Sequence, residues 1–169
     1  MRALIVAAEG TTDEEYVYPF YRLQEAGFDV HVSTPTHSPV RGVAGVKIVP
    51  TGEYHLVFGS GWFPELLVLP GGVKAIEKLR QQRSLIAFIA EHHMRRGFIA
   101  SICHGAQLLI SAGLCKGRLI SGYYSIRDDI TNAGGSYSEN PVIDGRIASC
   151  AHYKDMPAWM AATLREVGA

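Results

Sequence analysis

Short apolar runs alternate along the chain with longer stretches in which apolar positions recur at helical spacing. The strand-like runs cover residues 3–7, 28–33, 66–69 and 98–102, and the helical patterns cover 13–26, 84–96, 105–112, 125–133 and 155–167. Gly27 ends the first helix, and Ser84 is expected to cap the second. This alternation is typical of crossover units that build a parallel sheet with helices on both faces. The sequence therefore predicts an α/β fold.

Two smaller β-rich regions flank this pattern. Residues 40–49 carry β-type pieces around Gly42 and Gly45, which favours a small hairpin or an edge strand. A second strand pair is expected around Asp144-Gly145, because that dipeptide favours a tight turn. Leu119 to Ser121 is also strand-like.

Length and composition indicate one domain spanning residues 1–169. The chain is 47% hydrophobic, which is enough for a sizeable core, and no Pro/Ser-rich linker or run of charge divides it. Its 16 basic and 16 acidic residues cancel, so nothing favours a nucleic acid or an anionic membrane surface as partner. A small molecule or a second copy of the chain is expected instead.

Cysteine usage and the N-terminal residues indicate a reducing, cytoplasmic setting. Three cysteines at 103, 115 and 150 are too few and too irregular for a disulfide framework. The first apolar run meets Glu9 and Asp13 too soon for a signal peptide, and no run approaches 18 apolar residues.

Chemistry-bearing residues follow three of the predicted strands. They form three segments, which are residues 9–15, Pro70-Gly71-Gly72 and Cys103-His104. In open α/β sheets the ligand crevice lies outside the carboxyl ends of the strands, where the strand order reverses. These segments are therefore expected to meet at one crevice.

Cys103 is the first candidate for chemistry. An apolar run feeds Cys103, His104 and Gly105, and a helical pattern starts at once, which predicts a strand, a sharp turn and a helix. The N–H groups and positive end of that helix favour a thiolate, as would an imidazole or a protonated carboxyl beside the sulfur. The alternative is a buried cysteine that acts as a small apolar residue, as expected for Cys115.

Partners for the thiol come from the other two segments. Asp13, Glu14 and Glu15 face three directions on a helix, so at most one points toward Cys103, and Glu15 is expected to be that residue. His104 is a candidate imidazole only if a strained turn brings it beside its neighbour. Backbone N–H groups at Gly71 or Gly72, together with that of His104, could form an oxyanion hole.

Other polar and aromatic residues carry weaker signals. His92 and His93 lie in a helical pattern with charged neighbours and are expected on a solvated face, and no spacing typical of metal ligands occurs, so no metal is expected. Tyr123 could line the crevice. Cys150 and His152 follow a strand and could reach the crevice or lie at an edge.

Several motifs resemble those of one known family. They are Arg2-Ala3-Leu4-Ile5-Val6, Glu15 four residues before Pro19, Leu69-Pro70-Gly71-Gly72, Ala100-Ser101-Ile102-Cys103-His104-Gly105-Ala106-Gln107-Leu108-Leu109, and Ser125-Ile126-Arg127-Asp128-Asp129 with Asn132-Ala133-Gly134. Together they resemble the ThiJ/PfpI superfamily, most closely its intracellular protease I group. The resemblance implies a flavodoxin-like three-layer sandwich, Cys103 as nucleophile, Glu15 as the carboxyl partner of the sulfur, and the N–H groups of Gly72 and His104 as oxyanion donors.

The resemblance also implies a homo-oligomer, a dimer or a trimer of dimers. In the protease group a glutamate from a neighbouring subunit completes a Cys-His-Glu triad, and Glu77 is its counterpart here if one extra residue is allowed for. A helix-surface role for Glu77 is the alternative. The chain departs from the family pattern at residues 54–63 and at Cys150-Ala151-His152.

Three functions remain open at this stage. The first is a cysteine-dependent enzyme without a cofactor that acts on small reactive carbonyl compounds, as a glyoxalase III or a deglycase does. The second is an intracellular cysteine peptidase, which would need a groove rather than a small pocket. The third is a non-catalytic stress protein that senses oxidation through Cys103.

Overall fold

A six-stranded sheet runs through the centre of the structure, a computed structural model that describes residues 1–51 and 62–169. Its strands lie in the order β2 (Asp29–Ser33), β1 (Arg2–Val6), β5 (Leu66–Leu69), β6 (Phe98–Ile102), β10 (Ile147–Cys150) and β9 (Val142–Asp144). The first five are parallel, and β9 is antiparallel to β10. The predicted α/β fold with a mostly parallel sheet is confirmed.

The strand register brings several carboxyl ends to one level. Val6 pairs with Ser33, Leu69 with Ser101, and Cys150 with Ile102. The chain passes from β1 to β2 on one side and later to β5 on the other, so the strand order reverses between β1 and β5. A crevice is expected at such a reversal, and the three chemistry-bearing segments follow β1, β5 and β6.

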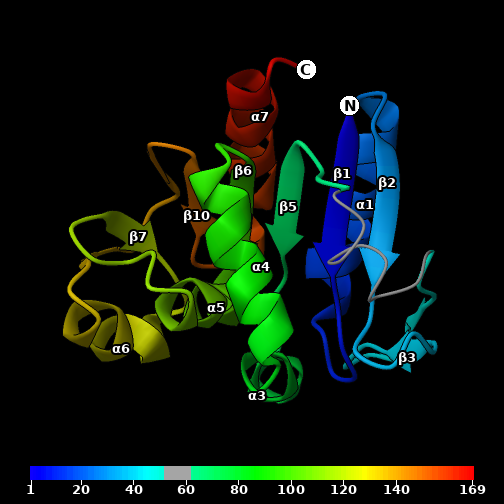
Figure 1. Cartoon of the computed structure of the whole chain (residues 1–169), viewed down its shortest axis with the longest axis horizontal. Coiled ribbons are helices and arrows are strands. Elements are labelled where there is room, and N and C mark those ends of the chain that lie inside the picture. The colour runs from blue at the N-terminus through cyan, green and yellow to red at the C-terminus, as the bar shows by residue number, and fades with distance from the viewer. Residues whose placement is uncertain (52–61) are drawn as a thin grey trace.

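Helices cover both faces of the sheet (Figure 1). One face packs against α1 (Asp13–Glu25) and α7 (Met156–Val167), and the other packs against α3 (Val73–Arg80), α4 (Arg83–Met94) and α5 (Ala106–Ser111). This arrangement is the three-layer sandwich expected from the family resemblance. No helix in the described part of the chain is long and apolar enough to cross a membrane.

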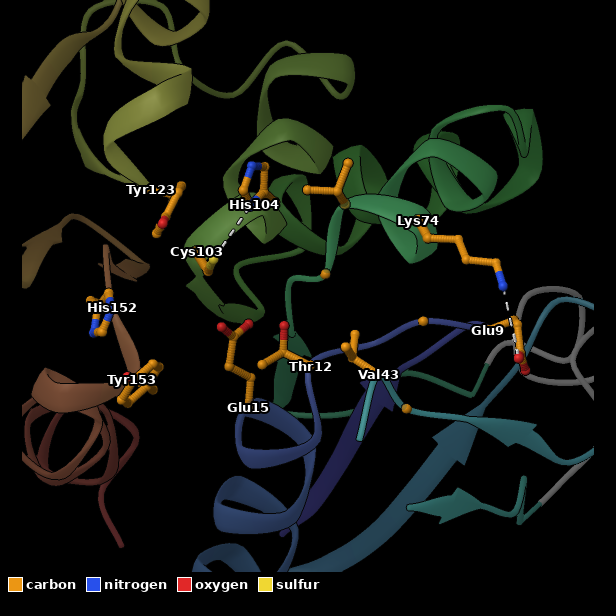
Figure 2. Close-up of a pocket in the computed structure, with 14 residues that line it drawn as sticks. Glu9, Thr12, Glu15, Val43, Lys74, Cys103, His104, Tyr123, His152 and Tyr153 are labelled. Atoms are coloured by element: carbon orange, nitrogen blue, oxygen red, sulfur yellow. Dashed lines mark hydrogen bonds and ion pairs between the residues drawn. The ribbon is translucent and has the colours of Figure 1, made fainter. Parts of the chain in front are cut away.

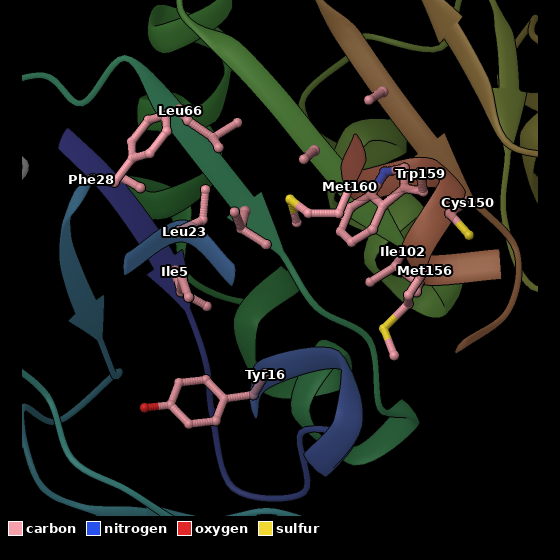
Figure 3. Packing of buried hydrophobic residues seen from close by; sticks show 14 of the residues in the cluster. Ile5, Tyr16, Leu23, Phe28, Leu66, Ile102, Cys150, Met156, Trp159 and Met160 are labelled. Atoms are coloured by element: carbon pink, nitrogen blue, oxygen red, sulfur yellow. The ribbon is translucent and has the colours of Figure 1, made fainter. Parts of the chain in front are cut away.

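Alternating side chains divide the core into two layers. In β1, Ala3 and Ile5 pack against the α1 and α7 side, whereas Leu4 and Val6 pack against the α3 and α4 side. Successive side chains of a strand point to opposite faces, so an uninterrupted apolar strand supplies both layers. In the first layer, Trp159 and Met160 of α7 lie beside Ile102, the last residue of β6 (Figure 3). This packing fully buries the end of β6, directly before Cys103.

Smaller elements complete the fold. The expected hairpin forms from β3 (Val40–Arg41) and β4 (Lys47–Ile48), and the expected strand pair from β9 and β10. A separate parallel pair joins β7 (Leu119–Ser121) to β8 (Ser136–Ser138), and β8 was not anticipated. Short 3-10 turns occupy Cys103–Gly105, Tyr124–Ile126 and Tyr153–Asp155, and α6 covers Arg127–Asn132. The departure from the family pattern at residues 54–61 lies outside the described residues.

Two predictions for α4 are wrong. Ser84 does not cap the helix, which begins at Arg83 after the extended residue Gln82. His92 does not face solvent, because it is only 1% exposed, and its Nε2 lies 3.1 Å from the carbonyl oxygen of Phe98. Its Nδ1 is buried and has no hydrogen-bond partner among the described residues. Burial, together with the charges of His93 and Arg146, lowers the pKa of His92.

Buried His92 is expected to make stability depend on pH. Its pKa is lower in the folded chain than in the unfolded chain, so the unfolded chain binds the proton more readily as the pH falls below about 6.5. The contribution of His92 to the free energy of unfolding should therefore fall between about pH 7 and about pH 5, so wild type should lose stability relative to His92→Gln over this range. Urea unfolding at several pH values measures this. The exposed-site control His37→Asn should keep the wild-type dependence, and an equal dependence in His92→Gln would contradict the assignment.

Candidate active site

Cys103 lies at a strained turn directly after β6. Its φ of 58° is in the left-handed region, which non-glycine residues seldom adopt. Gly105 permits the turn, because a Cβ at this position would collide with the carbonyl oxygen of Leu69 at the end of β5. The predicted strand, turn and helix are present, with the 3-10 turn Cys103–Gly105 leading into α5. The turn places the Cys103 thiol at the carboxyl end of the sheet.

The three consecutive acids of α1 face three directions, as their spacing predicts. Asp13 accepts hydrogen bonds from the N–H groups of Ala44 and Val46, at 2.6 and 2.7 Å, and so holds the hairpin. Glu14 is exposed. Glu15 is 2% exposed, and its carboxyl group lies beside the Cys103 thiol (Figure 2). The structure therefore brings the expected carboxyl group to the sulfur.

Gly71 holds that carboxyl group in place. Its N–H donates to Glu15 Oε2 at 2.6 Å. A Cβ built on Gly71 would lie 2.8 Å from this oxygen and 2.9 Å from both Cys103 Cβ and the His104 nitrogen, so only glycine fits between the three. The Gly71 N–H is thus committed to Glu15, whereas Gly72 lies in the cavity wall. Of the two glycines, Gly72 has the better position for an oxyanion donor.

Burial has the largest effect on the pKa values of the thiol and the carboxyl group, and it raises both. It raises the pKa of Glu15 from 4.5 to about 7, against hydrogen bonds from Gly71 and Cys103 that lower it. Burial and the Glu15 carboxylate also raise the pKa of the Cys103 thiol, which is 9% exposed, and the His104 N–H opposes this rise. The helix end, expected to favour the thiolate, does not lower the pKa of Cys103 below its ordinary value in the folded chain, because desolvation outweighs it.

His104 lies beside the sulfur, as the strained turn requires. Its Nδ1 is 3.4 Å from Cys103 Sγ, and its Nε2 is 3.4 Å from Ser125 Oγ. Burial lowers the pKa of His104, and the charge of Asp129 raises it. Sequence reasoning noted Ser125 and Asp129 only as parts of a family motif. The structure makes them the polar surroundings of this imidazole.

A cavity of about 720 Å³ opens in front of the thiol (Figure 2). Tyr123, His152 and Tyr153 form an aromatic wall, so of the two positions left open for His152, the crevice and the sheet edge, the structure places it at the crevice. The Tyr123 ring centroid is 5.0 Å from that of His104. Sequence reasoning did not single out the rest of the lining, which includes Glu9, Gly10, Thr12, Gly42, Val43, Val73 and Lys74.

Glu77 lies outside the main cavity, in a second cavity that His104 also lines. It is an exposed residue of α3, and it lines a second cavity of about 570 Å³ together with His104, Ser125 and Asp129 of the same chain. Glu77 and His104 of the same chain therefore line one cavity. A contribution of Glu77 from a second copy in a homo-oligomer stays a prediction.

The two other cysteines belong to the core. Cys115 and Cys150 are buried, and burial raises the pKa of each to about 11. The Cys150 thiol donates to the carbonyl oxygen of His152 at 3.3 Å, so it supports the loop that carries His152. Among residues 1–51 and 62–169, no group of three or more His, Cys, Asp or Glu side chains could hold a metal ion.

Comparisons with known proteins agree with this architecture. The sequence model described as the DJ-1/PfpI family matches residues 1–166. A Thermococcus kodakarensis protein named a deglycase is 36% identical over 161 residues, and the Pyrococcus furiosus deglycase PfpI is 34% identical over 161 residues; each alignment covers 95% of both chains. A two-domain Anabaena variabilis protein with dj-1/thij/pfpi-like and ferritin-like domains superposes with a TM-score of 0.92 at 27% identity. That alignment covers 99% of this chain and 48% of the other.

Proposed function

This chain belongs to the DJ-1/PfpI family, and from that premise we propose that it is a deglycase-like enzyme that uses Cys103 on small reactive carbonyl compounds and their early adducts with amines. Its relatives named deglycases support this class of activity. The observation that carries the proposal is the buried Glu15 carboxyl group, which lies beside the Cys103 thiol at one cavity and is electrostatically coupled to it.

The thiol and the carboxyl group act as one titrating pair. Each ionised partner makes ionisation of the other harder, so the pair loses a first proton at about the pKa of Glu15, near 7, and a second only at much higher pH. Between these steps the pair carries one proton and one negative charge. The raised pKa of the thiol keeps this proton mainly on the sulfur, and its transfer to Glu15 gives a thiolate beside a protonated carboxyl group. This state supplies the nucleophile at neutral pH despite burial.

The first chemical step is addition of this thiolate to an aldehyde carbon. A sulfur–carbon bond forms, the carbon–oxygen double bond becomes single, and the new oxyanion takes the proton that Glu15 or His104 delivers. The backbone N–H groups of Gly72 and His104 are the donors proposed for this oxyanion. With an amine adduct, the sulfur instead displaces the amine, which leaves with a proton.

Release of product needs no external oxidant or reductant. Glu15 as carboxylate removes the hydrogen of the hemithioacetal carbon as a proton, which gives an enediol once the adjacent carbonyl oxygen is protonated. Glu15 then returns its proton to the adjacent carbon, and the hemithioacetal hydroxyl loses its proton as its C–O bond becomes the new carbonyl. The result is a thioester of a 2-hydroxy acid, which water hydrolyses to regenerate the thiol. A carboxyl group with a pKa near neutrality suits both directions of this transfer.

The size of the cavity favours this proposal over a peptidase. A cavity of about 720 Å³ is within the range of small-molecule sites, whereas a peptidase must seat an extended polypeptide. Oxidation sensing also uses an activated thiol, so only the presence or absence of turnover distinguishes a sensor from an enzyme.

The proposal is tested by turnover of three substrates. Wild-type protein is expected to convert methylglyoxal to lactate and to release N-acetylarginine from its methylglyoxal adduct, while unfolded casein stays intact. Cleavage of casein without carbonyl turnover would replace the proposal with the peptidase. If none of the three reacts, the enzyme proposals fail and a sensing role is favoured.

A further inference from the structure

One ammonium group faces the cavity across from the aromatic wall. Among the described lining residues, Lys74 is the one lysine or arginine, and it extends from the first turn of α3 toward Glu9 (Figure 2). Glu9 lies on the same side of the cavity, whereas Val43 and Thr12 lie between Glu9 and Glu15 (Figure 2). The cavity therefore has a reactive sulfur in one part and a positive charge in another.

Lys74 and Glu9 form an ion pair, and each of the two side chains also contacts the backbone of another residue. Gly10 has a φ of 88°, and a Cβ there would lie 2.8 Å from Lys74 Cβ, so the lysine stem fits only because residue 10 is glycine. Glu9 Oε2 accepts the N–H of Arg41 at 2.8 Å. Its other oxygen, Oε1, lies 4.0 Å from Lys74 Nζ. One carboxylate oxygen is thus anchored, and the other faces the ammonium group at long range.

Stability does not account for a lysine at this position. The Lys74 and Glu9 side chains are 64% and 41% exposed, and such surface pairs contribute about 0–1 kcal/mol. A positive charge in the first turn of a helix is also opposed by the helix dipole. The long, exposed pair leaves the ammonium free to bind a better-placed anion.

We propose that Lys74 binds a carboxylate or phosphate at the far end of a 2-oxoaldehyde substrate whose aldehyde lies at Cys103. This assignment rests on the proposed function and narrows its substrate class. Methylglyoxal has three carbons and is far smaller than the cavity, which leaves room for a longer chain whose anionic end extends from the sulfur toward the ammonium group. The Glu9 carboxylate competes with an anionic substrate for the Lys74 ammonium group. It also keeps that ammonium group at this side of the cavity.

Matched substrates test this assignment. 4,5-Dioxopentanoate carries a carboxylate, 2-oxopentanal is its neutral counterpart with the same chain length, and 3-phosphooxy-2-oxopropanal carries a phosphate. Lys74→Gln is expected to lower kcat/KM for one or both anionic substrates by about ten- to hundredfold, because a charge-assisted hydrogen bond is lost. It should leave kcat/KM for 2-oxopentanal little changed. The ratio between the two anions identifies the preferred group.

Two further variants sharpen the comparison. Glu9→Gln removes the opposing charge and is expected to raise kcat/KM for the anionic substrates. Lys78→Gln removes an equal charge from an exposed position of the same helix and should change neither substrate class. Equal effects of Lys74→Gln on anionic and neutral substrates, or no effect on either, would overturn the assignment.

A binding measurement separates this assignment from the proposed function. In a Cys103→Ser background, calorimetry should detect 4-oxopentanoate but not 2-pentanone, and added salt or Lys74→Gln should weaken the binding. If wild-type protein converts no 2-oxoaldehyde, the proposed function fails, and this titration alone decides the role of Lys74. Equal binding of the acid and the ketone, or no binding of either, counts against it.

Discussion

Replacing Cys103 with serine is expected to lower kcat/KM for methylglyoxal by at least about a thousandfold. A hydroxyl group has nearly the shape of a thiol, but its proton is far too weakly acidic for the Glu15 carboxyl group to share. The backbone strain at φ 58° stays the same, so folding should be little affected. Initial-rate assays together with thermal unfolding measure both effects.

The matched control is the second buried thiol. Cys115→Ala removes a thiol that lies in the core, outside the residues lining the main cavity, and should retain turnover. Retention of turnover within about tenfold in Cys103→Ser would show that the sulfur does not react with substrate.

Glu15→Gln is expected to abolish turnover and stabilise the fold at neutral pH. The wild-type carboxyl group has a pKa of about 7 in the folded chain against 4.5 for the model compound, so keeping it ionised while buried costs about 3 kcal/mol above pH 7. The neutral amide avoids this cost, and its oxygen can still accept the Gly71 N–H. It cannot exchange a proton with the sulfur or the substrate.

The stability gained by Glu15→Gln depends on pH. Below about pH 4.5 the carboxyl group is protonated in both folded and unfolded chains, so wild type and Glu15→Gln should unfold with similar free energies. The variant should gain stability progressively from there to about pH 7 and then keep a constant advantage. Denaturant unfolding across this range measures it. Glu14→Gln, on the exposed side of α1, is the control, and an advantage independent of pH would contradict buried ionisation at Glu15.

Local patterns were enough to predict most of the fold and part of the site. The apolar runs of β1, β5 and β6 and the turn at Cys103 depend on residue types close in sequence. The position of Glu15 follows from helix geometry, since three consecutive residues cannot share one direction. Placing these segments at strand ends then brings Glu15 and Cys103 together, as the structure does.

Features that depend on tertiary packing were missed. His92 has charged neighbours in sequence, but the fold buries its ring against Gly97 and Phe98. The acidity of Cys103 depends on how completely the surrounding chain removes water, which no local motif records. Glu9 and Lys74 are 65 residues apart in sequence and meet only because β1 and β5 are adjacent in the sheet.

The central claim is that the Cys103 thiol and the Glu15 carboxyl group share one proton at neutral pH. Its most direct test is the rate at which iodoacetamide alkylates Cys103, followed by mass spectrometry across a range of pH. The rate should rise in a step near pH 7 in wild type, and the step should move to higher pH in Glu15→Gln, where burial alone sets the acidity of the thiol. A step at or above about pH 8.5 in both proteins, as for an ordinary thiol, would contradict the account.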